Sequence, residues 1–414
     1  MKLSDIKEEF SKYIILKDEH AIEMIVASVI GNLLIDRDPL WIFIVAPSSG
    51  GKSTLVAPIG GIPSVHFIDD LTEKTFLSGY KMKGKEMSLL KMIGSGIIAF
   101  SDFTSILAKN SMSRNEILGQ MRLVYDGIFT KQTGTGKIEW KGKIGVLAAC
   151  TPDIYLLLED VRSAGERFIF YWLEQPSDEE IYAKQQEVKI SSREITEKMK
   201  GMYAEYFTDI QAWAKKYGNP EFRVSDEQRM LLRQAAIFCV NGKTVVHTDF
   251  KSGLADSIPN KAGVGRDAKM FDTLLQTLQL MNCYEKDDPT IPVQDWMIDI
   301  VEKCSYSSVN RERRKILEIL ADTEQQLTAS EIGAREGLGL EKESVEKYLI
   351  PLHSVGLIKK NASTAKFRWY IDNDDIKFFI KRVSARLVET VVPPAIEQSG
   401  EGDLLEEYNR EHTV

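Results

Sequence analysis

The sequence predicts an α/β fold: a three-layer domain built on a parallel sheet, followed by a largely helical region. Two observations carry this prediction. Short, continuous apolar runs occur at 41–45, 65–68, 96–100, 144–149 and 168–172, which is typical of strands buried on both faces. The segments between them are long enough for helices, and strands that alternate with helices are typical of a parallel sheet covered on both faces.

The composition excludes several classes of protein. The chain has 414 residues, enough for two or three domains, and its 43% hydrophobic and 28% charged residues are typical of a globular protein. No apolar run reaches ~18 residues and residues 1–10 lack the pattern of a signal peptide, so we expect a cytoplasmic protein with no membrane partner. The net charge of −8 restricts any nucleic-acid contact to local basic patches. Four scattered cysteines indicate neither a disulfide framework nor a zinc ribbon.

In chain order we expect five parts. Residues 1–36 show helical spacing and predict an N-terminal helical segment, and residues 37–178 hold the strands and predict the α/β core. Residues 179–304 predict a helical lid and linker, with helices at 179–217, 224–240, 264–283 and 291–304. Residues 305–390 predict three helices and then a β-hairpin, which is the winged-helix order. Residues 391–414 carry six acids against one arginine and predict a disordered acidic tail.

The first strand runs directly into a glycine loop. Residues 46–53 match G-x-x-x-x-G-K-[ST], except that Ala46 stands at the first position. In such a loop the backbone N–H groups surround the β-phosphate, Lys52 reaches the β- and γ-phosphates, and the Ser53 hydroxyl holds Mg²⁺. We therefore expect ATP and Mg²⁺ as cofactors. The candidate nucleotide-binding residues of this loop are Pro47, Ser48, Ser49, Gly50, Gly51, Lys52, Ser53 and Thr54.

A carboxylate for the same site follows the strand at 96–100. Asp102 either orients Mg²⁺ with no glutamate beside it, or polarises the attacking water with Ser101 in place of the metal-binding aspartate. A third interpretation is that Asp102 only caps the next helix. The incomplete acid pair leaves the rate of hydrolysis open, although it does not affect nucleotide binding.

Three later stretches extend the pattern: 115–127 (NEILGQMRLVYDG), 145–152 (GVLAACTP) and 165–168 (GERF). Together with the phosphate loop, their order resembles the AAA+ ATPases of the MCM-like kind, and more closely the ATP-binding proteins of phages and other mobile elements. The resemblance covers roughly residues 40–175. It implies an AAA+ P-loop core with a helical lid.

The resemblance also implies residue roles. Thr151 stands where the family has a polar sensor that holds the attacking water, although it is also placed to cap a strand. Arg167 stands where the family has an arginine that reaches the γ-phosphate of the neighbouring subunit, the alternative being a surface ion pair. Arg266 is a candidate for the lid arginine that senses ATP. A shared site requires a homo-oligomer, which in this family is often a hexameric ring.

Two hairpins are candidate DNA contacts. In the relatives, a hairpin like that at 129–143 lies in the ring's channel; its candidate residues are Lys131, Lys137, Lys141 and Lys143. A solvated hairpin is the alternative. In the winged helix, three glutamates at 340–348 disfavour groove reading, whereas the wing lysines and arginine are placed to hold a DNA backbone. Protein docking is the equal alternative for this module. The wing residues are Lys359, Lys360, Lys366 and Arg368.

The leading hypothesis is therefore an ATP-dependent DNA motor, a replicative helicase-like AAA+ ATPase of phage or mobile-element type. It hydrolyses ATP between subunits of a ring and moves single-stranded DNA through a channel. The first alternative is an ATP-gated replication initiator or helicase loader with slow hydrolysis, which acts with other replication proteins. The second is a nucleotide-dependent defence or regulatory ATPase for which DNA is irrelevant.

Overall fold

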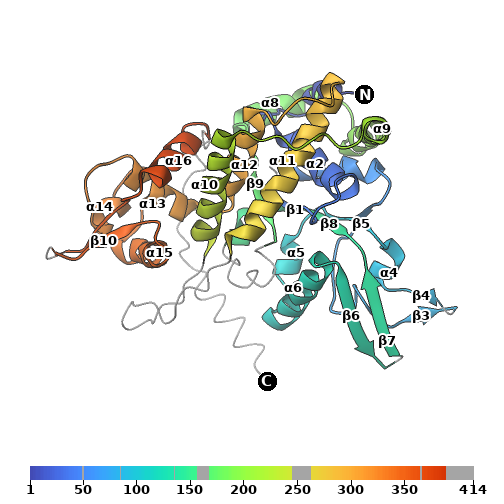
Figure 1. Cartoon of the computed structure of the whole chain (residues 1–414), viewed down its shortest axis with the longest axis horizontal. Helices are drawn as coiled ribbons and strands as arrows, with labels where there is room; N and C mark the ends of the chain where they lie inside the picture. Colours follow the sequence, from blue (N-terminus) through green and yellow to red (C-terminus); the bar gives the residue numbers. More distant parts are fainter. Residues whose placement is uncertain are drawn as a thin grey trace.

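The computed structural model describes residues 1–414 except 49–50, 84, 135, 156–166, 245–262, 364–365 and 388–414 (Figure 1). It confirms an α/β core with a five-stranded parallel sheet, followed by a mostly helical part that carries a small hairpin. The acidic tail expected at 391–414 lies outside the described residues.

All strands of the main sheet are parallel, and their order is β2-β5-β8-β1-β9. The five apolar runs of the sequence form these strands, with ends that differ by no more than one residue. Because the strands are parallel, their carboxyl ends share one edge of the sheet, here called the carboxyl edge, and their amino ends share the opposite, amino edge. The strands are β1 (Trp41–Val45), β2 (Val65–Phe67), β5 (Gly96–Phe100), β8 (Ile144–Cys150) and β9 (Ile169–Trp172).

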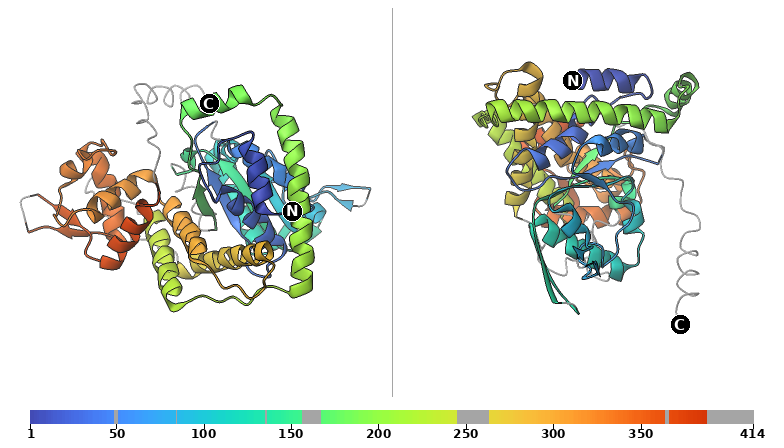
Figure 2. Two further views of the ribbon diagram at one scale, coloured as in Figure 1. Left: turned by 90° about the horizontal axis from the view of Figure 1, so that it is seen from above. Right: turned by 90° about the vertical axis from the view of Figure 1, so that its right-hand side faces the viewer.

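Helices cover both faces of the sheet, so the core has three layers (Figure 2). Alternate residues of β1 belong to two separate hydrophobic clusters. Ile42 and Ile44 pack in the cluster that includes α2 (Ala21–Leu33), while Phe43 and Val45 pack in the cluster that includes α6 (Ser111–Tyr125). This burial on both sides explains why the strands are continuous apolar runs.

The middle of the chain is helical, as expected. The predicted helix at 179–217 is two helices, because Ser191 accepts a hydrogen bond from the N–H of Glu194 and caps a new one. The short helices before this region are α1 (Leu3–Ser11), α3 (Lys52–Val56), α4 (Leu89–Ile93) and α5 (Thr104–Leu107), with 3₁₀ turns η1 (Ala57–Gly61) and η2 (Pro152–Tyr155). The longer ones are α8 (Asp178–Glu187), α9 (Ser192–Tyr217), α10 (Asp226–Lys243), α11 (Val264–Lys286) and α12 (Asp295–Ser307).

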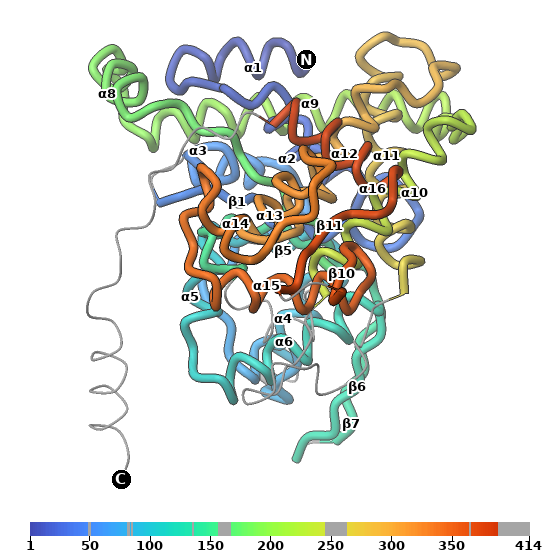
Figure 3. The backbone as a smooth tube through the Cα atoms, turned by 90° about the vertical axis from the view of Figure 1, so that its left-hand side faces the viewer, coloured from blue at the N-terminus to red at the C-terminus, as the bar shows by residue number. Residues whose placement is uncertain are grey.

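The C-terminal part contains the three expected helices and the hairpin, and then one helix that the sequence reasoning missed (Figure 3). That helix, α16 (Asp374–Ser384), returns to the rest of the chain, where Arg382 Nε lies 3.1 Å from Glu302 Oε2 on α12. The other elements are α13 (Arg311–Ala321), α14 (Ala329–Gly333), α15 (Lys342–Ser354), β10 (Lys359–Asn361) and β11 (Arg368–Tyr370).

Besides β10–β11, the described residues form two more antiparallel hairpins outside the main sheet. The expected hairpin is formed by β6 (Ile128–Thr133) and β7 (Gly136–Lys141), and it projects from the body in Figure 1. Since β7 ends just before β8 begins, this hairpin joins the sheet at its amino edge. A second, smaller hairpin of β3 (Lys81–Met82) and β4 (Lys85–Glu86) was not predicted, because two-residue strands leave no periodic pattern.

Candidate functional site

The glycine loop leaves the sheet at the carboxyl edge, directly after β1. Gly51 has a φ of +69°, a backbone conformation that other residues adopt only with strain, and α3 begins at the next residue. The ammonium of Lys52 turns back into the loop and donates to the carbonyls of Ala46 and Pro47, at 2.6 Å each. Burial lowers the pKa of Lys52, while the nearby Cys150 and Asp102 act in the opposite direction. The lysine is therefore held at the mouth of the loop, within electrostatic range of Asp102.

The other candidate loop residues are placed as follows. Ser53 and Ser48 are exposed, while Pro47 and Thr54 are half-buried. Ser49 and Gly50 lie outside the described residues. The hydroxyl that was predicted to hold Mg²⁺ is thus accessible at the first turn of α3.

Asp102 and Thr151 meet at the same edge, because β8 lies between β1 and β5. Asp102 is exposed and its Oδ1 accepts a hydrogen bond from the N–H of Thr104 at 2.8 Å. The Thr104 hydroxyl lies 3.5 Å from that of Thr151, which in turn donates to Asp153 Oδ2 at 2.8 Å. These contacts form a polar row across the ends of β5 and β8. Sequence reasoning missed Asp153, although the Thr-Pro-Asp after an apolar run was a visible signal.

Arg167 lies at the amino edge, far from the phosphate loop of its own chain. Its side chain is buried and its Nη2 lies 3.2 and 3.3 Å from the carboxylate oxygens of Asp126, with the guanidinium 5.4 Å from the ring centre of Tyr125. Ile42 of β1 pairs with Ile169 of β9, so six residue steps of roughly 3.3 Å, about 20 Å in all, separate Arg167 from Ala46 along the strands. The alternative interpretation of Arg167 was a surface ion pair, and Arg167 does form an ion pair, with Asp126.

Arg266 is near the same place. Burial raises the pKa of the Tyr125 hydroxyl, Asp38 raises it further, and the positive charges of Arg266 and Arg167 act to lower it. Because Tyr125 packs edge-on against Trp41 at the start of β1, this places Arg266 at the amino edge as well. The two candidate arginines therefore share one edge, and Lys52, Asp102 and Thr151 share the other.

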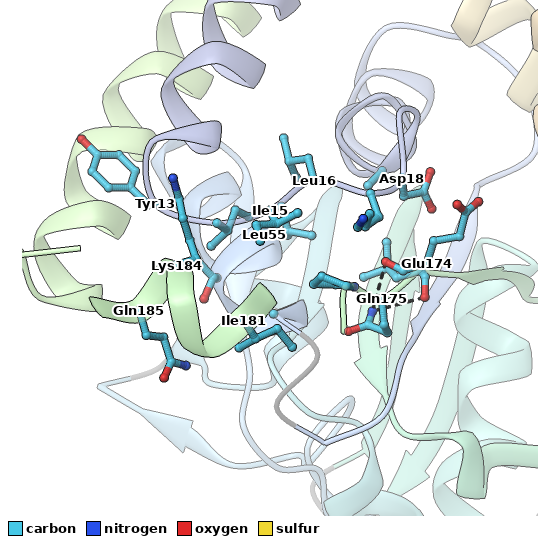
Figure 4. A pocket seen from close by; sticks show the side chains of 17 residues that line it. Tyr13, Ile15, Leu16, Asp18, Leu55, Glu174, Gln175, Ile181, Lys184 and Gln185 are labelled. Carbon is cyan, nitrogen blue, oxygen red and sulfur yellow. Dashed lines mark hydrogen bonds between the residues drawn. The ribbon is translucent and has the colours of Figure 1, made fainter. Parts of the chain in front are cut away.

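A pocket adjoins the phosphate loop (Figure 4). One wall is the segment 13–18 that precedes α2, and the others are Gly51, Thr54 and Leu55 of the loop and α3, residues 173–176 after β9, and one face of α8. Ile14, Leu16, Leu55 and Ile181 supply apolar surface, while Asp18, Glu174 and Gln175 supply polar groups at one end. No motif marks the segment 13–18, so its part in a site was not foreseen.

The four lysines of the β6–β7 hairpin differ in their surroundings. Lys137 and Lys141 are exposed and flank Glu139, at 3.3 and 3.4 Å. Lys131 donates to the carbonyl of Glu73 at 3.1 Å. Lys143 donates to the carbonyls of Gly31 and Ile35 near the end of α2, and burial lowers its pKa to about 8. Lys137 and Lys141 are thus the two that present their charge to solvent.

The β10–β11 hairpin combines basic side chains with aromatic ones. The ammonium of Lys360 lies 3.6 Å from the ring centre of Phe367, which is 51% exposed. Arg368 donates to the carbonyl of Gln326 at 2.7 Å, while Lys359 and Lys366 are exposed. Lys359 adjoins a hollow lined by Asp372, Asp374 and Asp375, so positive charge is concentrated toward the free end of the hairpin.

Comparison with known proteins yields no family: no protein-family model matches the chain, and no curated protein matches it in sequence. Among the described residues, no helix combines the length and apolar character needed to span a membrane. No group of three or more His, Cys, Asp or Glu side chains suited to a metal ion occurs in the same described ranges.

Proposed function

We propose that the chain is an ATP-dependent DNA motor, an AAA+ ATPase of the replicative helicase-like kind found in phages and mobile elements, working as a ring of identical subunits. The observation that carries the proposal is the distribution of site residues over the sheet. Lys52, Asp102 and Thr151 meet at the carboxyl edge, and Arg167 and Arg266 lie at the amino edge.

The carboxyl edge fits ATP and Mg²⁺. Lys52 would exchange its two carbonyl partners for β- and γ-phosphate oxygens, which are stronger acceptors because they are charged. The Ser53 hydroxyl and Asp102 would hold Mg²⁺, which would supply positive charge to neutralise the phosphates. Thr151 would orient the attacking water, with its own hydroxyl fixed by Asp153.

The pocket beside the loop supports a purine nucleotide as the ligand. It is continuous with the loop through Gly51 and Thr54, and its apolar walls suit the faces of a base. Polar groups at one end, among them Gln175, suit the base edge. In this proposal the base and ribose occupy the pocket while the phosphates lie along residues 47–53.

The amino edge supports a shared site. Neither arginine reaches the phosphates of its own subunit across the sheet, whereas a neighbour in a head-to-tail ring brings its carboxyl edge to this position. An arginine there neutralises charge on the transferred phosphoryl group. Asp126, half-exposed, would hold Arg167 until the neighbour's γ-phosphate competes for it.

The hairpins support contact with single-stranded DNA. Lys137 and Lys141 supply exposed charge on β7, and in the proposed ring this hairpin lines the channel. The C-terminal part, which we interpret as a winged helix, would add Lys359 and Lys366, with Phe367 as a stacking surface for a base.

One observation favours the slower alternative, an initiator or helicase loader. Asp102 already accepts the N–H of Thr104, and a carboxylate engaged in a backbone hydrogen bond is less free to polarise water. This alternative uses the same ATP site and differs in the rate of turnover.

ATP hydrolysis by the purified protein, with and without single-stranded DNA, tests the proposal. We expect turnover that rises with DNA and disappears in Lys52→Ala, with Lys143→Met as a control that leaves the stimulation intact. Background turnover despite ATP binding would favour the loader. Failure to bind ATP at all would refute both.

A further inference from the structure

We infer that Lys303 of α12 is a positioning residue: it holds together two walls of the pocket beside the phosphate loop and links that pocket to the C-terminal helix α16. The inference rests on the proposed function, since it takes this pocket as the place where the base of the nucleotide binds.

The contacts of Lys303 are short and enclosed. Its ammonium donates to Asp18 Oδ2 at 2.8 Å and to Glu174 Oε1 at 2.7 Å, and it lies 4.8 Å from the ring centre of Tyr171. The Tyr171 hydroxyl donates to the second oxygen of Asp18 at 2.8 Å. Asp18, Tyr171 and Lys303 are buried, so this network is shielded from solvent and salt.

Both carboxylates belong to pocket walls. Asp18 ends the segment 13–18 and Glu174 lies in the segment 173–176, and Figure 4 shows the two at the same end of the pocket. Within the described part of the chain, no backbone hydrogen bond fixes residues 15–17. Side-chain contacts must therefore set the position of this wall. Among these contacts, the ion pair of Asp18 with Lys303 is the most deeply buried.

Glu302, the residue before Lys303, forms ion pairs with helix α16. Glu302 is 1% exposed, and its Oε2 lies 3.1 Å from Arg382 Nε and 3.2 Å from Arg386 Nη1, both on α16. Adjacent residues of α12 thus bind the pocket walls and α16. A base that moves either wall would shift α12, and α16 would follow, because closely packed elements transmit displacement.

Two ligands separate this role from general damage to the fold. ATP contacts both the loop and the pocket, whereas inorganic tripolyphosphate contacts only the loop. Removal of the ammonium should loosen the walls, so Lys303→Met should bind ATP roughly tenfold or more weakly, about 1.4 kcal/mol per factor of ten, with unchanged affinity for tripolyphosphate. Lys303→Arg keeps the charge and should restore most of the ATP affinity. Lys7→Met, which removes the 2.5 Å ion pair with Glu23 outside the pocket, is the matched control and should not change ATP affinity.

Hydrogen exchange tests the link to α16. In the wild-type protein ATP should change the protection of α16, and this change should be absent in Lys303→Met and in Glu302→Gln. If Lys303→Met fails to fold, Glu174→Gln replaces it, because Glu174 is the more exposed partner and its loss should still weaken ATP binding severalfold.

Equal weakening of ATP and tripolyphosphate, or unchanged affinity for both in a folded Lys303→Met protein, would overturn the inference. If the wild-type protein binds ATP no more tightly than tripolyphosphate, the pocket does not bind the base. That outcome would refute the nucleotide part of the proposed function itself.

Discussion

Arg167 provides the sharpest test of the shared site. The arginine side chain reaches roughly 7 Å across six bonds of about 1.3–1.5 Å, whereas about 20 Å separates its backbone from its own phosphate loop. If Arg167 serves a neighbour, Arg167→Ala should lower turnover by about 10³-fold or more without affecting ATP binding. Lys52→Ala should be equally inactive, because it loses the ammonium that contacts the phosphates bound in the same subunit.

Mixing the two inactive variants then gives a numerical expectation. In a randomly assembled ring with equal amounts of each, half of the subunits keep Lys52 and half of their neighbours keep Arg167. About one quarter of the interfaces should therefore be complete, and about one quarter of the wild-type turnover should return. The assay is steady-state phosphate release from proteins denatured separately, mixed and refolded together.

Two results would refute the reasoning. A mixture that stays inactive although the variants co-assemble would mean that Arg167 does not act across an interface. The control Asp126→Asn removes the ion-pair partner and leaves Arg167 in place. If it loses as much activity as Arg167→Ala, the pair serves the fold and not the reaction.

Three further predictions follow from the contacts. The double variant Lys137→Ala, Lys141→Ala should weaken single-stranded DNA binding and reduce the slope of log affinity against log salt by about 1.4. The control Lys143→Met should leave this slope unchanged. Binding titrations at several salt concentrations measure the slope. The pKa of Glu9 is about 2 because Lys198, Tyr13 and Lys12 hydrogen-bond to its carboxylate, so the charged carboxylate stabilises the fold above pH ~4.5 and this effect is lost toward pH 2. In acid unfolding, the difference in free energy of unfolding between wild type and Glu9→Gln should shrink as the pH falls over that range. A difference that stays constant would contradict this prediction. Phe43→Ala should lower the free energy of unfolding by about 3–5 kcal/mol in urea melts, because this buried ring stacks on Phe168 at 4.0 Å, whereas the exposed Ile128→Ala should change it by less than about 0.5 kcal/mol.

The sequence was most informative where burial was complete on both sides. The runs at 41–45, 96–100 and 144–149 could be predicted as strands because every residue of β1, β5 and β8 is buried, which leaves a continuous apolar signal. The loop after β1 could be predicted because its chemistry fixes residue types at fixed spacing.

The rest depends on contacts that no local pattern encodes. The four hairpin lysines are alike in sequence, yet Lys143 is drawn inward by the carbonyls at the end of α2. The place of Arg266 beside Tyr125 depends on how α11 packs. The pocket wall at 13–18 mixes apolar residues with Lys17 and Asp18, and this mixture forms no recognisable motif. By contrast α16 had a signal, Asn373 as cap before Ile376, Phe379, Ile380 and Val383.

The order in which the chain is made has a consequence for its synthesis. The sheet is complete at Trp172, but one of its faces is covered in part by α9 to α12, which end only at Ser307. At ~5–20 residues per second, a ribosome needs roughly 7–27 s to supply that cover. During this interval the nascent chain exposes an apolar parallel sheet, which is prone to aggregate. We therefore expect co-translational chaperone binding, and insolubility of any fragment that stops near residue 178.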